Sequence, residues 1–425
     1  MSNTPDITQP EETAPSSSWM STDGWRVIAA RALRTFGYGF TSVLLGVTLT
    51  AAGFSTLQVG LLLSMALVGD VFAIILVALF ADRLGRRRVL VFFALLMAVS
   101  GLAFAFSHNF IILVLAAFVG TISPSSSENA PFSAIEQAIL PQTCSAERRT
   151  AVFARYNIAA QFMGALGGLA VVIPDILHQL MGMTTTFAVR AMFAGYAVLA
   201  LSTVALFLGL SEKVECEPHK HSSPSPLKLS TSLHTSRAIV FRLASLFAVD
   251  AFAGGLVVQT ILSLWFHQRF GVPLSMLGVL FFGTNLLAAF SLQVAVWLAR
   301  RIGLLNTMVF THLPSNILLM LVPLMPSFPL AALCLLCRQA LSQMDVPTRQ
   351  AYTMTLVTPE ERTAAASLTT VARSVSLSLS PLLAGALLTG SVLSLGLPFL
   401  IGGGLKAVYD LALYGVFRKV KVVRG

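Results

Sequence analysis

The stretch Ala81-Asp82-Arg83-Leu84-Gly85-Arg86-Arg87 stands between two apolar segments, 57–81 and 89–107. Each segment is about as long as the roughly 20 residues that a helix needs to cross a bilayer. A glycine between charged residues ends the first segment and opens the second. The stretch is therefore predicted to be a short connection at a membrane surface between two spanning helices.

The rest of the chain has the same character. Of its 425 residues 56% are hydrophobic and 11% are charged, against roughly 25% charged in soluble domains. We expect an all-α membrane protein with twelve transmembrane helices, at residues 27–50, 57–81, 89–107, 110–138, 151–173, 186–210, 241–264, 275–298, 305–325, 328–351, 364–389 and 396–417.

Basic residues gather in every second connection, for example Arg86–Arg88, Arg148-Arg149 and Arg300-Arg301. Only Arg190 and Arg269 fall near the opposite face. Because cytoplasmic connections carry the excess of Lys and Arg, we predict that both termini are cytosolic. The net charge of +10 then reflects topology, and no nucleic-acid partner is expected.

The helices are predicted to form two bundles of six. We expect a disordered cytosolic tail without a signal peptide (1–24), an N-terminal bundle (25–210), a Ser/Pro/His-rich cytosolic linker (211–240), a C-terminal bundle (241–418) and a short tail (419–425).

The two halves repeat each other weakly. A shift of 218 residues, 271 minus 53, superposes four positions of the first half on four of the second: Gly53, Gly60, Arg83 and Gly85 fall on Gly271, Gly278, Arg301 and Gly303. Six-helix repeats that run parallel characterise one large class of secondary transporters.

The charged stretch resembles the signature loop of the major facilitator superfamily, G-x-L-A-D-R-x-G-R-K/R. It departs from that pattern at Ala78 and Phe80. A degenerate copy, Ala299-Arg300-Arg301-Ile302-Gly303, stands in the second half. The resemblance covers about residues 25–418 and implies two pseudo-symmetric bundles that rock about a central site.

The resemblance also implies a cytosolic gate. In the family the loop aspartate faces the start of the eleventh helix, which here begins near Thr363, and a loop arginine pairs with an acid of the fourth helix, here Glu136. The gate residues would be Asp82, Arg83, Gly85, Arg86, Glu136 and Arg349. A purely topogenic role is the alternative, and we favour it for Arg87 and Arg88.

Charged residues inside a membrane are costly and need a reason. On the tenth span Arg338, Ser342, Asp345 and Arg349 share one helical face. This face could be an anion-binding or proton-linked site, or it could be a ladder of internal ion pairs. By resemblance, spans 1, 4, 7 and 10 line the central cavity, and span 11 repeats the polar spacing of span 10. The candidate substrate residues are Arg34, Tyr38, Glu128, Arg338, Ser342, Asp345 and Arg373.

Two acids are candidate proton carriers. Asp250 comes first, because its span has no other charge between Arg242 and the outer end, and Asp70 comes second. The alternative for both is a fixed salt bridge to Arg31, Arg34, Arg338 or Arg373. Lys406 and Asp410, four residues apart, are expected to pair with each other.

No metal or cofactor site is expected. Cys334 and Cys337 could line a soft-metal route, and the linker sequence Glu215–His221 contains ligand types, but ordinary packing and a solvated linker are preferred. A P-loop is excluded because the chain has no Gly-Lys pair. A zinc protease is excluded because no His is followed by Glu. An aspartyl intramembrane protease would carry Tyr-Asp and Gly-x-Gly-Asp. Gly69-Asp70 and Tyr409-Asp410 resemble these elements, but position 67 is Leu and the two elements occur in the wrong order.

The sequence thus predicts a secondary active transporter of a small molecule that works by alternating access, is coupled to protons and acts in efflux as an antiporter. The alternatives are an uptake symporter or uniporter of an organic anion or metabolite, or a non-transporting sensor. We expect a monomer that spans the lipid bilayer of a bacterial inner membrane many times.

Overall fold

The computed structural model describes residues 19–126, 131–215, 236–358, 361–389 and 392–418, and these residues form only helices, turns and connections. In the first half the helices are α1 (Thr22–Ala51), α2 (Thr56–Leu84), α3 (Arg86–Phe106), α4 (Phe110–Val119), α5 (Phe132–Ile139), α6 (Arg149–Leu169), α7 (Ile173–Met181) and α8 (Thr185–Leu208). In the second they are α9 (Arg237–Gly255), α10 (Gln259–Phe270), α11 (Leu274–Ile302), α12 (Leu304–Leu321), α13 (Phe328–Ser342), α14 (Asp345–Leu356), α15 (Arg362–Leu387) and α16 (Val392–Phe417).

Within the described residues nine helical segments are long and apolar enough to cross a membrane. The all-α membrane architecture is confirmed, whereas the number of twelve spans is not. The three expected spans missing from the nine are 27–50, 110–138 and 328–351. The first corresponds to α1, which has 30 residues but carries Arg26, Arg31 and Arg34. The other two are each divided into two shorter helices.

Prolines account for both divisions. Pro347 has no N–H and its ring clashes with the carbonyl four residues earlier, at Gln343, so α13 ends and α14 begins around that point. Pro124 and Pro131 lie between α4 and α5. The two interrupted segments occupy corresponding places, the fourth span of each half, and such pairs mark the binding site in repeat-built transporters.

Glycines make the same turn in each half. Gly85 and Gly303 have φ of 94° and 87°, and Gly53 and Gly271 have φ of 94° and 63°, conformations that a Cβ disfavours. These are two of the pairs related by the shift of 218 residues. The weak sequence repeat therefore encodes matching turns, and we call the two ends of the bundle the Gly85 end and the Gly53 end.

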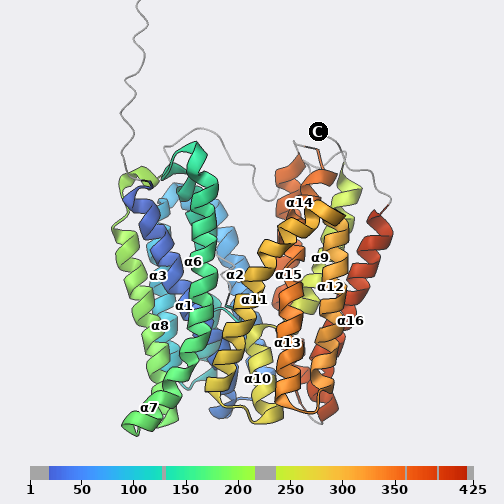
Figure 1. Cartoon of the computed structure of the whole chain (residues 1–425). Coiled ribbons are helices and arrows are strands. Elements are labelled where there is room, and N and C mark those ends of the chain that lie inside the picture. The colour runs from blue at the N-terminus through green and yellow to red at the C-terminus, as the bar shows by residue number, and fades with distance from the viewer. Residues whose placement is uncertain (1–18, 127–130, 216–235, 359–360, 390–391, 419–425) are drawn as a thin grey trace, which may run out of the picture.

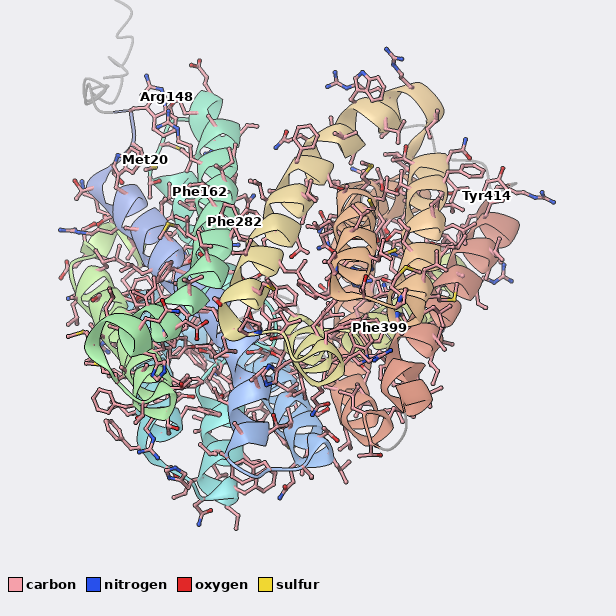
Figure 2. All side chains as sticks on the ribbon, turned by 60° about the horizontal axis from the view of Figure 1, so that its bottom comes forward. Met20, Arg148, Phe162, Phe282, Phe399 and Tyr414 are labelled. Atoms are coloured by element: carbon pink, nitrogen blue, oxygen red, sulfur yellow. The ribbon has the colours of Figure 1, made fainter. Side chains whose placement is uncertain are left out.

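The halves are joined toward the Gly53 end. Nε2 of Gln259 on α10 donates to Oγ of Ser42 on α1 at 3.0 Å, and the backbone N–H of Leu382 on α15 donates to Oγ of Ser64 on α2 at 2.9 Å. Figure 1 shows the two halves converging at the bottom of the view, where α10 lies, and separating toward the top. Figure 2 shows Phe162 of α6 and Phe282 of α11 on facing helices, while Arg148 and Tyr414 lie on opposite rims.

Candidate transport site

A buried ion cluster occupies the second half, centred on Asp250 of α9. Its Oδ1 lies 2.5 Å from Nζ of Lys406 on α16, and its Oδ2 lies 2.9 Å from Arg373 on α15 and 3.2 Å from Arg349 on α14. The side chain of Asp250 is only 3% exposed. Asp250 has no partner on its own helix, as its sequence indicates, but three other helices supply one each. Asp250 therefore makes the ion pair with Arg373 that was named as the alternative, and its role as a proton carrier stays a prediction.

Arg349 connects two carboxylates. Its Nη1 lies 2.5 Å from Oδ2 of Asp345, one turn earlier on α14, as well as near Asp250. Its guanidinium also lies over the ring of Phe247, 5.5 Å from the centroid. Arg349, expected at the cytosolic gate, is buried in the ion cluster in this structure.

Asp410 completes the cluster on α16. Its Oδ1 lies 2.9 Å from Nδ1 of His312, and its Oδ2 accepts from Nδ2 of Asn316 at 2.8 Å. The prediction that Lys406 and Asp410 form a self-contained pair is wrong, because Lys406 reaches across to Asp250. Asp410 instead contacts His312 and Asn316, both on α12.

Arg338 of α13 lacks such a carboxylate. Its Nη1 donates to Oε1 of Gln339 at 2.9 Å, and its Nε is buried with no hydrogen-bond partner in the described part of the chain. Oε1 of Gln339 also accepts from Ser342 at 3.3 Å. Asp250 and Asp345 are near enough for their charges to act on Arg338, yet among the described residues no acid lies within ion-pair distance of it.

The cluster carries surplus positive charge. Its cations are Arg338, Arg349, Arg373 and Lys406, and its carboxylates are Asp250, Asp345 and Asp410. Four positive charges minus three negative charges leave one positive charge while His312 is neutral. A buried surplus charge favours an anionic ligand, because an uncompensated ion in low dielectric is costly.

A cavity of about 460 Å³ opens beside the cluster, between α2 of the first half and α9, α14 and α15 of the second. Arg349 and Arg373 reach it from the cluster, and Asp70 lies in the wall formed by α2. Hydroxyls of Thr353, Thr369, Thr370 and Ser374 add hydrogen-bonding groups. The structure thus brings Asp70 and Arg373 to one cavity, although 303 residues separate them in sequence (373 minus 70).

The first half contains a second ion pair. Arg34 of α1 lies 2.7 Å from Glu136 of α5, with both side chains fully buried, and Tyr156 donates to the same carboxylate at 2.8 Å. Glu136 therefore meets Arg34 in this structure, and its expected pair with Arg86 stays a prediction. Arg34 and Tyr38, expected to line the cavity, are almost inaccessible at 0% and 1% exposure.

The signature loop is held by an acid that its pattern does not include. The carboxylate of Glu215 accepts from the backbone N–H groups of Arg86 at 2.6 Å and Arg87 at 3.2 Å, and so caps the start of α3. Gly85 provides the positive φ that this turn requires, and Arg83 is exposed. The side chain of Asp82 and all of Glu128 lie outside the described residues, so their roles stay predictions.

His312 was missed by the sequence analysis. A signal was present: it lies deep in an apolar span, and Asn316 follows one turn later on the same face. The sequence of α12 does not indicate the partners of His312, because Asp410 and Asp250 lie on other helices.

The described structure places no third metal ligand beside Cys334 and Cys337. Cys334 and Cys337 are free thiols on α13, and Cys337 is exposed. Across the described part of the chain no group of three His, Cys, Asp or Glu side chains could hold a metal ion.

Known transporters have the same fold. The nucleoside transporter NupG superposes with a TM-score of 0.71 at 14% identity, covering 94% of this chain and all (100%) of that one. The xylose transporter XylE from E. coli gives 0.67 at 15% identity, covering 95% and 99%. The human organic anion transporter MFSD10 gives 0.60 at 19% identity, covering 92% and 98%.

Sequence comparison points the same way. The chain is 28% identical over 420 residues to an uncharacterised membrane protein of Saccharomyces cerevisiae, covering 92% of this chain and 93% of that one. That relative is a yeast protein, so the prediction of a bacterial inner membrane receives no support from it. The model of the Major Facilitator Superfamily matches residues 27–381. With the apolar helices, the signature loop and the shared fold, this match shows that the chain is a multi-pass integral membrane transporter that belongs to the Major Facilitator Superfamily.

Proposed function

We propose that the chain is a proton-coupled secondary transporter of a small organic anion. The observation that carries this proposal is Arg338, a membrane-embedded arginine whose Nε is buried without a hydrogen-bond partner and that has no acid within ion-pair distance among the described residues. Intramembrane charges that no protein group compensates mark ligand pathways. Arg373, which is 31% exposed toward the cavity, would supply the second cation.

The site is suitably placed for alternating access. Arg338 lies on α13 of the interrupted α13–α14 segment and outside the lining of the cavity, whereas Arg349 of α14 and Arg373 of α15 line it, and the cavity lies between helices of both halves. Contacts toward the Gly53 end close one side. Rocking of the halves about this region would expose the site to each side in turn.

Charge balance supports coupling to a proton. An anion that binds Arg373 competes with Asp250 for the same guanidinium. When Asp250 loses this cation, a proton bound nearby stabilises its negative charge. Anion and proton then favour each other's binding, as reciprocal linkage requires. This linkage favours the alternative of an anion carried together with a proton over the exchange of anion for proton that efflux by antiport would need.

The test uses purified protein in proteoliposomes with an imposed pH gradient and a panel of radiolabelled organic anions, neutral sugars and nucleosides. We expect accumulation of an anion, and a loss of at least about tenfold in Arg338→Gln, the cost of one charged hydrogen-bonding partner. Arg190→Gln is the matched control, because Arg190 contacts His108 at the exposed Gly53 end.

Arg338→Gln should fold normally, since it leaves no carboxylate without its ion-pair partner, and elution of a monodisperse peak on size exclusion verifies this. Accumulation of only neutral compounds, or equal transport by both variants, would contradict the proposal.

A further inference from the structure

We propose that His312 of α12 is the residue that holds the coupled proton, as an imidazolium between Asp410 and Asp250. The inference rests on the proposed coupling to protons and names the group that performs it. His312 is 3% exposed. Its Nδ1 lies 2.9 Å from Oδ1 of Asp410 and its Nε2 lies 3.9 Å from Oδ1 of Asp250.

Both ring nitrogens therefore face a carboxylate. An ionised carboxylate only accepts hydrogen bonds, so we assign the ring hydrogen to Nδ1, which then donates to Asp410 at 2.9 Å, although Nδ2 of Asn316 also lies 3.2 Å from Nδ1. In the neutral ring, the lone pair of Nε2 then faces the carboxylate of Asp250. Both groups are hydrogen-bond acceptors, so this contact is unfavourable. A proton on Nε2 turns that contact into an attraction between an imidazolium and a carboxylate.

The surroundings hold the ring in this orientation. From α16 come Asp410 and Tyr409, whose ring stands perpendicular to the imidazole with centroids 6.1 Å apart. Asn316 of α12 donates to the second oxygen of Asp410 at 2.8 Å and so fixes the carboxylate that fixes the ring. The other charged groups of the cluster are Lys406 from α16, Arg349 and Asp345 from α14, Arg373 from α15 and Arg338 from α13.

Asp250 is a poor place for the proton itself. Three cations lie within 3.2 Å of its carboxylate, and protonation would leave them facing a neutral acid in a buried site, which is strongly unfavourable. His312 is next to the same carboxylate and adds a positive charge where a negative one already lies. Histidine is also the side chain whose charge changes most readily between about pH 5 and pH 8.

The positive charge of a protonated His312 acts on the cavity through Asp250. Nε2 of His312 and Nζ of Lys406 approach the same oxygen, Oδ1, while Arg373 holds Oδ2. An imidazolium at Oδ1 compensates Asp250 from the buried side, so Arg373 can turn from Asp250 toward an anion in the cavity. His312 thereby acts through Asp250 as a positioning residue for the anion site.

The first experiment requires no substrate. Nitrogen NMR of histidine-labelled protein in lipid nanodiscs resolves the ring signals of the 7 histidines, and the signal that disappears in His312→Gln identifies His312. We expect that signal to change from a ring protonated only at Nδ1 to one protonated at both nitrogens as pH falls. A ring that keeps one protonation state from about pH 5 to pH 8 overturns the inference.

The second experiment measures transport of the anion found in the proteoliposome screen. His312→Gln should lose accumulation driven by a pH gradient by at least about tenfold while retaining exchange of labelled for unlabelled anion, because exchange needs no net proton movement. His267→Gln is the control, since His267 bonds the backbone of Val272 near the Gly53 end and should keep both activities.

The two proposals fail in different ways. If no anion is transported but His312 titrates, the substrate assignment is at fault. If an anion accumulates and His312→Gln still concentrates it under a pH gradient, the proton is elsewhere and this inference is wrong.

Discussion

At the scale of single residues, Asp250 shows how position changes the meaning of a charge. The sequence of its own helix predicts an isolated acid that is free to carry a proton. In the structure it contacts cations from three other helices. An acid in that setting is chiefly a hub that orders Arg349, Arg373 and Lys406, and its removal disturbs the fold as well as the coupling.

Asp250→Asn is accordingly expected to lower the free energy of unfolding by about 3–5 kcal/mol, the usual cost of leaving buried partners uncompensated. The double variant Asp250→Asn/Lys406→Met should recover part of that loss, because it also removes one uncompensated cation. Chemical denaturation of the purified protein in detergent measures both. A single variant as stable as the unaltered protein would show that the ion pairs contribute nothing to folding.

At the scale of helices, close backbone contacts depend on glycine. Between the halves, a Cβ on Gly385 of α15 would lie 2.3 Å from the carbonyl oxygen of Thr56 on α2. Within the first half, a Cβ on Gly167 of α6 would lie 2.0 Å from the carbonyl oxygen of Phe36 on α1. The steric conflict is similar, but only the first contact must break when the halves rock apart.

Gly385→Ala should therefore shift the conformational equilibrium toward separation of the halves at the Gly53 end. Distances between spin labels at Leu57 and Gln268, both exposed near that end, should lengthen. Gly167→Ala is the matched control: it should cost roughly 1–3 kcal/mol of stability through overpacking without lengthening that distance. The same distance distribution in both variants would remove the distinction between the two contacts.

At the scale of the whole molecule, the two ends of the bundle differ in charge. The basic connections around Arg86–Arg88 and Arg300-Arg301 lie at the Gly85 end, and the turn at Gly271 lies at the other. The sequence-based assignment of the Gly85 end to the cytosol depends on the excess of positive charge there.

Reporter fusions test that orientation. Fusions after residues 210 and 418 should report a cytosolic position, and a fusion near residue 270, where α10 ends, should report the opposite side. A cytosolic signal at 270 would require another arrangement of the spans, since α9 and α10 together are long enough to cross the membrane once.

Much of the architecture follows from the sequence alone, because it depends on local properties. Long apolar segments must be helices in lipid, and the loop around Gly85 with its counterpart at Gly303 marks the family and its repeat. The divisions at Pro347 and between α4 and α5 could also have been anticipated, since a proline inside a helical segment removes a backbone hydrogen bond.

The tertiary structure alone decided which charges meet. Spacing along a helix identifies neighbours three or four residues apart, and it correctly placed Asp345 beside Arg349. It paired Lys406 with Asp410 and left Asp250 alone, and it gave no partner for His312. Those contacts arise where α9, α12, α14, α15 and α16 pack together, and a long side chain buried among several helices binds whichever opposite charge the packing brings nearest.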